Sequence, residues 1–311
     1  MKLLLTLCFL MLSLFAQEPI KKYKAHGAVV DMLINNNKLY LSTDAGTVDI
    51  FDIKTAKNIK TIKVEKIKDF VGDEVDSKVY SVDVLGTSTL VLSQTSGGFR
   101  RVDIHVDGKR ERVIDAKDYL AIAKAKFLNK ETIIIADLSN EISSFNIKTK
   151  QKNWSFQASG AKFSNFVLDE KREQIVIADE SGDLKIHATK DGKFIKKLAG
   201  KNLDNVFQVD FKNGVIATAG QDRRVVIYEP YSAYYKTAPF LIYSVGLSPS
   251  GKRVGYSSDE NNNVTVFDTK TKQDLATLNG NRMTLTNIIF MNENEIFISS
   301  DDSTVNYYKI K

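Results

Sequence analysis

The segment Tyr243-Ser244-Val245-Gly246-Leu247-Ser248-Pro249-Ser250-Gly251-Lys252 decides the fold, together with the two β-rich stretches that follow it. The first of these ends in Ser257-Ser258-Asp259, and the second covers 264–268. Short β-rich stretches bounded by Ser, Pro, Gly, Asp and Asn are typical of hairpin-connected strands. This part of the chain therefore predicts successive antiparallel strands.

The same unit recurs along the chain. Its β-rich centre is found at 39–42, 90–93, 133–136, 175–178, 215–218, 253–256 and 295–298. The strand after each centre carries a bulky residue, in turn Phe51, Val102, Phe145, His187, Tyr228, Phe267 and Tyr308. Four strands repeating every ~40–45 residues are typical of a propeller blade. The sequence predicts an all-β fold, a seven-bladed β-propeller.

The last unit is one strand short, because the sequence ends at Lys311 directly after its third strand. An open strand edge would leave backbone groups unpaired. A spare β-rich stretch at 20–24 precedes the first unit. We therefore expect this N-terminal strand to complete the seventh blade and close the ring.

The N-terminus is typical of a cleavable signal peptide. Met1-Lys2 is followed by an apolar run at 3–14 and by Ala16. A membrane-spanning helix needs about 20 residues, more than this run supplies. We expect a signal peptide at 1–16, a single propeller domain at 17–311, no membrane span after cleavage, and a periplasmic location. The alternative is a buried N-terminal helix of a cytosolic protein.

Composition excludes several kinds of site. The chain has 311 residues, 44 Lys and Arg against 38 Asp and Glu, and one cysteine, Cys8, which lies in the predicted signal peptide. A thiolate zinc site, an iron–sulfur cluster and haem attached through cysteine are therefore excluded. The three histidines, His26, His105 and His187, are isolated from one another along the chain, as structural histidines are. No serine-nucleophile or phosphate-loop motif is present. We expect no catalytic residue and no cofactor.

The repeat resembles the WD-repeat propellers. The best match is the unit at 243–268, and the first unit adds Ala25-His26-Gly27 and Ile50-Phe51-Asp52. The Trp-Asp pair of that family is degenerate here, since the single tryptophan is Trp154 and Phe, Tyr, His or Val stands in its place. The resemblance implies a propeller that binds other proteins, with a His–Asp hydrogen-bond network in the first unit alone.

Charged residues in the first strands suggest an alternative function. We interpret Asp31, Asp83 and Asp210 as corresponding positions of units one, two and five, with Lys126 in that position of unit three. First strands line the channel of a propeller, where carboxylates could hold a divalent ion as in lactonase-like periplasmic enzymes. Polar contacts between blades, or a solvated channel wall, are the favoured interpretation.

Basic clusters occur at three places in the chain. They are Arg100-Arg101, Lys109-Arg110 with Arg112, and Arg223-Arg224. Charge alone would suggest that these clusters bind nucleic acid, but nucleic acid is not an expected partner of an exported protein. We expect these residues to be solvated strand edges that block aggregation.

Two loops exceed what a blade requires and are the candidate protein-interaction sites. The first is the acidic insertion at 69–77, with Asp69, Asp73, Glu74 and Asp76. The second is an aromatic cluster around Pro230 and Pro239: Tyr231, Tyr234, Tyr235 and Phe240. Aromatic residues on loops are enriched in protein interfaces. The alternative for the tyrosines is an outer strand packed on its neighbour.

The overall features also resemble the NapL family of exported propellers, which are encoded with the periplasmic nitrate reductase. This resemblance implies a non-enzymatic scaffold, an accessory or maturation factor whose partner is a periplasmic reductase subunit, with no nucleic acid bound. We expect a monomer. The competing hypotheses are the metal-dependent channel enzyme, a quinone-binding propeller and an assembly factor at the outer membrane.

Overall fold

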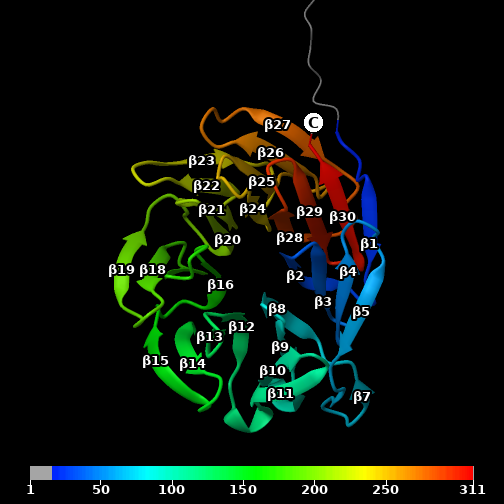
Figure 1. Ribbon diagram of the computed structural model, residues 1–311. Helices are drawn as coiled ribbons and strands as arrows, with labels where there is room; N and C mark the ends of the chain where they lie inside the picture. The colour runs from blue at the N-terminus through cyan, green and yellow to red at the C-terminus, as the bar shows by residue number, and fades with distance from the viewer. Residues whose placement is uncertain (1–15, 311) are drawn as a thin grey trace, which may run out of the picture.

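The computed structural model describes residues 16–310 as a ring of seven four-stranded antiparallel sheets around a central channel (Figure 1). The all-β, seven-bladed prediction is confirmed. The helical content of these residues is two single 3-10 turns, η1 (Ser96–Gly98) and η2 (Ala116–Asp118). No helix in residues 16–310 has the length and apolarity needed to cross a membrane. The predicted signal peptide at 1–16 lies, except for its last residue, outside the described residues.

The first four blades follow one another along the chain. Blade 1 contains β2 (Val29–Asn35), β3 (Lys38–Thr43), β4 (Thr47–Asp52) and β5 (Asn58–Lys63). Blade 2 contains β8 (Val79–Leu85), β9 (Ser88–Gln94), β10 (Arg100–Val106) and β11 (Lys109–Ile114). Blade 3 contains β12 (Ile122–Phe127), β13 (Thr132–Asp137), β14 (Glu141–Asn146) and β15 (Gln151–Gln157). Blade 4 contains β16 (Phe163–Leu168), β17 (Gln174–Asp179), β18 (Leu184–Ala188) and β19 (Phe194–Leu198).

The remaining blades include the composite one. Blade 5 contains β20 (Val206–Lys212), β21 (Val215–Gly220), β22 (Arg224–Tyr228) and β23 (Ala233–Thr237). Blade 6 contains β24 (Val245–Leu247), β25 (Arg253–Ser257), β26 (Val264–Asp268) and β27 (Asp274–Leu278). Blade 7 contains β28 (Leu285–Phe290), β29 (Glu295–Ser300), β30 (Thr304–Lys309) and β1 (Lys21–Lys24).

The N-terminal strand closes the ring as predicted. β1 pairs antiparallel with β30, from Lys21 opposite Tyr307 to Lys24 opposite Thr304, and Figure 1 shows the two strands side by side. Tyr23 anchors β1, since its ring is fully buried against Phe51 and Phe297, at centroid distances of 5.8 and 5.6 Å. Its hydroxyl donates to the carbonyl oxygen of Ile53 in blade 1 (2.7 Å).

The apolar core lies between neighbouring blades and is not a single cluster. The seven bulky third-strand residues predicted from the repeat are all buried. One cluster joins Tyr40 and Val48 of blade 1 to Val79 and Val91 of blade 2, and similar clusters join other neighbouring blades. A blade therefore buries its apolar faces only when the neighbouring blades are in place. Because burial of apolar area is the main driving force of folding, the blades stabilise one another.

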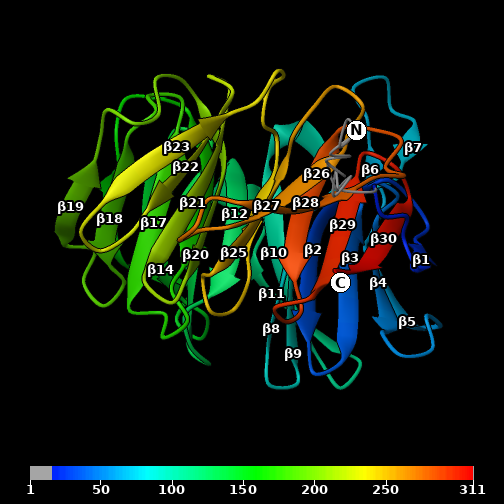
Figure 2. The same cartoon turned by 90° about the horizontal axis from the view of Figure 1, so that it is seen from above.

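The two faces of the ring are built from different loops (Figure 2). Because the strands are antiparallel, the loops from second to third strand and from the fourth strand to the next blade emerge at one end. We call this end the upper face. The loops from first to second and from third to fourth strand form the lower face.

Polar contacts tie the upper-face loops to the blades. In blade 1, His26 Nδ1 lies 2.7 Å from Asp49 Oδ1, as the WD-repeat resemblance implied. Other blades of the described chain make ties at comparable places with different residues. In blade 5, Thr218 Oγ1 donates to Asn202 Oδ1 (2.8 Å), and Asn202 Nδ2 donates to the Tyr228 hydroxyl (3.1 Å). Comparable contacts are Ser77–Arg101 in blade 2, Ser159–Asp179 in blade 4 and Asn281–Asn306 in blade 7. Different residue types make these ties, so a search for His and Asp missed them.

Candidate functional site

A one-residue bulge sets the register of the inner strands. It falls between Val29 and Asp31 in β2, and the same irregularity occurs in β8, β12, β16, β20 and β28. The residue after the bulge is polar in each of these strands: Asp31, Ser81, Lys124, Asn165, Gln208 and Asn287. We call these residues the upper tier and those two positions later the lower tier.

The bulge corrects one sequence interpretation. Asp83, Lys126 and Asp210 share the lower tier, whereas Asp31 belongs to the upper tier. Asp31 does not correspond to the other two aspartates, because it lies two residues after the start of the bulge in its strand, whereas Asp83 and Asp210 lie four residues after the start of theirs.

Upper-tier side chains bind the inner strand of the following blade. Asp31 Oδ2 accepts a hydrogen bond from the Val82 amide (3.0 Å). Gln208 Oε1 accepts one from the Val245 amide (2.9 Å). Across the ring closure, Asn287 Nδ2 donates to the carbonyl oxygen of Val30 (3.3 Å). The upper tier therefore ties blades together at the channel.

The lower-tier aspartates make the same kind of contact. Asp83 Oδ2 accepts a hydrogen bond from the Phe127 amide, and Asp210 Oδ2 accepts one from the Leu247 amide, both at 2.8 Å. Lys126 Nζ lies 3.1 Å from Asp31 Oδ2 and donates to the Val82 carbonyl oxygen (2.7 Å). The channel carboxylates are thus engaged in polar contacts between blades, the favoured interpretation.

The environment of Asp31 keeps it ionised. Burial alone would raise the pKa of its carboxyl. The positive charges of Lys126 and Lys124 and the hydrogen bond from the Val82 amide outweigh burial, so the pKa lies below its usual range. Asp31 and Lys126 therefore form a partly buried ion pair between blades 1 and 3.

Residues 16–310 contain no cluster of three or more His, Cys, Asp and Glu side chains placed to hold a metal ion. The histidines lie apart. His26 contacts Asp49, and the His187 ring stacks on Phe156 with centroids 4.0 Å apart. Burial lowers the pKa of both His187 and His105.

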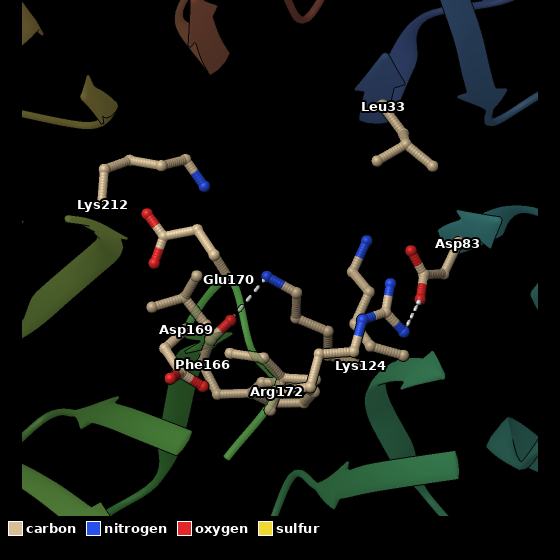
Figure 3. A pocket seen from close by; sticks show the side chains of 11 residues that line it. Leu33, Asp83, Lys124, Phe166, Asp169, Glu170, Arg172 and Lys212 are labelled. Atoms are coloured by element: carbon tan, nitrogen blue, oxygen red, sulfur yellow. Dashed lines mark hydrogen bonds and ion pairs between the residues drawn. The ribbon is translucent and has the colours of Figure 1, made fainter. Parts of the chain in front are cut away.

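The channel contains connected hollows. The largest, of about 390 Å³, extends from the upper tier to Met291 at the end of the inner strands. At the lower mouth a hollow of about 280 Å³ is lined by Lys124, Arg172 and Lys212 together with Glu170. Figure 3 shows the Lys124 ammonium directed at a backbone oxygen of β16 and Arg172 directed at Asp83.

The acidic insertion forms a small hairpin on the upper face. Its strands are β6 (Ile67–Lys68) and β7 (Glu74–Val75), between β5 of blade 1 and β8 of blade 2 (Figure 2). Asp69 stabilises the turn, since its Oδ1 accepts hydrogen bonds from the Val71 and Asp73 amides (3.0 and 2.9 Å). Asp73, Glu74 and Asp76 are exposed, and Glu74 and Asp76 lie near Lys66 (3.7 and 4.0 Å).

The hairpin tip is apolar, which the sequence analysis missed by attending to its charges. The Phe70 side chain is 99% exposed, and Val71 is 66% exposed. The signal was present as two apolar residues in the middle of an acidic insertion. Contiguous exposed apolar area marks interaction sites, and the hairpin tip contributes two adjacent apolar side chains to the upper face.

Arg101 anchors the base of the hairpin. Its guanidinium is buried, donates to Ser93 Oγ (2.9 Å), and pairs with Glu65 (3.1 Å). Glu65 also binds Arg110 and Arg112, and hydrogen bonds from these two lower its pKa to about 2.

The prediction of solvated basic edges is therefore corrected for part of the set. Arg101 is buried, and Arg100, Arg112 and Arg224 are partly buried. Lys109, Arg110 and Arg223 are exposed. The sequence could not distinguish the buried arginines from the exposed ones, because the burial of Arg101 depends on Glu65 in the preceding loop.

The three candidate tyrosines lie in different environments. Tyr231 is fully exposed in a lower-face loop between β22 and β23. Tyr234, in β23, packs at the boundary of blades 5 and 6, and its hydroxyl donates to the Thr269 carbonyl oxygen. The Tyr235 ring lies under the Arg224 guanidinium (4.2 Å). Tyr234 and Tyr235 thus belong to an outer strand that packs on its surroundings, the alternative interpretation.

Exposed large apolar side chains concentrate on the upper face. They occur in loops distributed around the ring: Phe70, Val71, Val75, Tyr119, Leu138, Leu203, Phe240 and Met283. Of the other exposed large apolar side chains of residues 16–310, Tyr231 lies in a lower-face loop and Ile20 directly precedes β1, and the rest lie in outer strands: Ile59, Phe194, Ile195 and Tyr235. The two faces therefore differ in their capacity to bury apolar area against a partner.

Comparison with known proteins gives the fold. No protein-family model matches the chain, and no curated protein is similar to it in sequence. Among solved structures, the chain is similar to the β-propeller domain of Myceliophteria thermophila Cps50 (Swd1), with a TM-score of 0.75 and 14% sequence identity. The alignment covers 94% of this chain and 99% of that one. The protein is thus similar to a known β-propeller over almost its entire length.

Proposed function

We propose that this protein is a non-enzymatic propeller scaffold whose upper face binds a protein partner. The observation that carries the proposal is the concentration of exposed apolar side chains in the upper-face loops. Single exposed apolar side chains are ordinary on a monomer's surface, so the proposal rests on their unequal distribution between the loops of the two faces.

The part of the upper face around the hairpin is ordered before binding. Ser96 Oγ, in the adjoining loop, donates to the carbonyl oxygen of Lys68 at the hairpin base (3.1 Å). In the same loop, Phe99 packs edge-on against Tyr119 at a centroid distance of 5.3 Å. A surface already held in place loses less conformational entropy on binding, which favours affinity.

We also propose an exported protein whose partner is a subunit of a periplasmic reductase. This finer assignment rests on the signal-peptide pattern of 1–16 and on the resemblance to the NapL family. Isolation of the partner from a periplasmic fraction, followed by its identification, tests the location and the partner together. Recovery of the mature chain from the cytoplasm alone would contradict the location.

The hairpin tip provides the first test of the upper face. We expect the double variant Phe70→Ser, Val71→Ser to bind the partner about 30-fold more weakly, because a buried interface anchor contributes about 2 kcal/mol or more. The melting temperature should stay within a few degrees, since exposed substitutions usually change stability by less than about 0.5 kcal/mol. Quantitative pull-down and calorimetry measure the two effects.

Tyr231→Ser is the matched control, since it removes an equally exposed aromatic side chain from the lower face. It should leave partner recovery unchanged. Equal losses in the two variants would show general stickiness of exposed apolar residues, and a loss confined to Tyr231→Ser would place the partner on the lower face.

The lactonase-like enzyme is the second candidate function, and metal content distinguishes it. We expect elemental analysis of the purified protein to find no stoichiometric divalent ion, because Asp31, Asp83 and Asp210 each accept a hydrogen bond from a backbone amide of the next blade. A stoichiometric ion that disappears in Asp31→Ala, Asp83→Ala and Asp210→Ala would instead favour the enzyme.

A further inference from the structure

The largest hollow of the channel has two chemically different walls. Its volume of about 390 Å³ lies near the lower end of the range of ~300–1,000 Å³ found for small-molecule sites. Leu33, Leu247, Ile289 and Met291, from blades 1, 6 and 7, provide apolar side chains. Blades 3, 4 and 5 provide most of the polar ones: Lys124, Lys126, Asn165, Gln208, Asp210 and Lys212. Asp31 of blade 1 and Asn287 of blade 7 are also polar, and Val167 and Val209 add apolar side chains from blades 4 and 5. A ligand with a polar head and an apolar body matches such a cavity.

Lys124 is the channel cation that lacks a carboxylate partner. Lys126 pairs with Asp31 (3.1 Å), Lys212 with Asp210 (3.7 Å) and Arg172 with Asp83 (3.6 Å). Lys124 takes part in no ion pair of residues 16–310, although it is partly buried. Its Nζ donates only to neutral acceptors, Asn165 Oδ1 (2.8 Å) and the Phe166 carbonyl oxygen (2.9 Å).

The position of Lys124 makes its charge available to a ligand. It lines the large hollow, the lower mouth and a third hollow of about 170 Å³ at the upper tier. Around the large hollow three lysines face two aspartates, and those aspartates are held by Lys126 and Lys212. Further carboxylates, Asp169 and Glu170, lie at the lower mouth.

The unpaired charge is costly for the folded protein. Burial, and then the like charge of Lys126, lower the pKa of Lys124 to about 8, against the opposing effect of Asp31, Asp210 and Asp83. A buried ammonium without a counter-ion is destabilising, and an anion that supplies the counter-charge binds favourably. Charge-assisted hydrogen bonds to a carboxylate are also stronger than those to neutral acceptors.

We propose that the central channel binds a small carboxylic acid, with its carboxylate at Lys124 and its apolar body against Leu33 and Ile289. The site lies inside the ring, apart from the upper face, and does not depend on the proposed scaffold function.

Benzoate and hexanoate, with benzamide and hexanamide as uncharged analogues, are suitable probes for ligand-observed NMR and calorimetry on the full chain. We expect each acid to bind at least 10-fold more tightly than its amide. Lys124→Gln removes the charge while its side-chain amide can still donate to the Phe166 carbonyl oxygen, and it should abolish this preference. Lys197→Gln, which breaks a lysine–aspartate pair on the outer strand of blade 4 and lines none of the three channel hollows, should change acid binding less than threefold.

A second measurement uses the protein with its native sequence. The NMR titration of dimethylated lysines should show one amine with a depressed pKa that rises when benzoate is added. Equal binding of acid and amide, undiminished acid binding by folded Lys124→Gln, or no binding of either acid at millimolar concentration would overturn the proposal. Because the hairpin-tip variants leave the channel intact, failure of the proposed scaffold function would leave acid binding unaltered.

Discussion

Replacing Tyr23 by alanine is expected to lower the free energy of unfolding by about 3–5 kcal/mol, the range for truncation of a large buried aromatic side chain. The ring of Tyr23 is fully buried between Phe51 of blade 1 and Phe297 of blade 7, and its hydroxyl binds blade 1. The substitution weakens the contacts of β1 with blade 1 and blade 7. Because these contacts close the ring, their loss should destabilise the whole domain.

Chemical denaturation of the wild type, Tyr23→Ala and Tyr23→Phe measures this effect. Tyr23→Phe removes only the hydrogen bond to Ile53 and should cost about 1 kcal/mol. Tyr235→Ala, which removes a partly exposed tyrosine from the outer strand of blade 5, is the control and should have a much smaller effect. If Tyr23→Ala proved no more damaging than Tyr235→Ala, β1 would not hold the ring closed.

Replacing Lys126 by methionine is expected to destabilise the protein by about 3–5 kcal/mol, because it leaves the Asp31 carboxylate without its cation in the channel wall. The double variant Asp31→Asn, Lys126→Met should be more stable than this single variant. It removes the uncompensated charge and keeps an acceptor for the Val82 amide. Denaturation of the two single variants and the double variant gives the coupling energy.

The pH dependence provides a second readout. The pKa of Asp31 is below its unfolded value of about 3.9, so its ionisation stabilises the wild type above that pH. This stabilisation is lost as the pH falls through the folded pKa. The difference between wild type and Lys126→Met should therefore narrow under acid conditions. A difference that stays constant from neutral to acid pH would show that lost packing, and not lost charge, weakens the variant.

The fold was predictable because the repeat is visible in residues that the fold must bury. A bulky residue recurs in the third strand of each unit and is buried, as Phe267 and Tyr308 are. The last unit lacked a fourth strand, which indicated that 20–24 would complete it. Strand alternation is a local property of the chain, and an open edge needs a pairing strand wherever in the chain that strand lies.

The candidate site was less predictable because it depends on register and on contacts between blades. Asp31 and Asp83 lie two and four residues after the start of the bulge in their strands, and the sequence does not mark where that bulge falls. Arg101 is buried by Glu65 from another blade, which no local pattern indicates. The 69–77 insertion was predicted as an interaction site from its length and charge, whereas the exposure of Phe70 is visible only in the structure.

Closure by β1 also has a kinetic consequence. Blades 1 to 6 each consist of consecutive strands and can form as soon as their own residues are available. Blade 7 joins Lys21 to Tyr307, about 290 residues apart, and loop-closure entropy grows with such a separation. β1 is therefore synthesised early but can pair only after β30 has been synthesised. Until then the incomplete ring presents open strand edges at both ends, so a chain interrupted before β30 stays exposed to proteolysis. The pairing of β1 with β30 therefore completes the ring only in a chain that extends through β30.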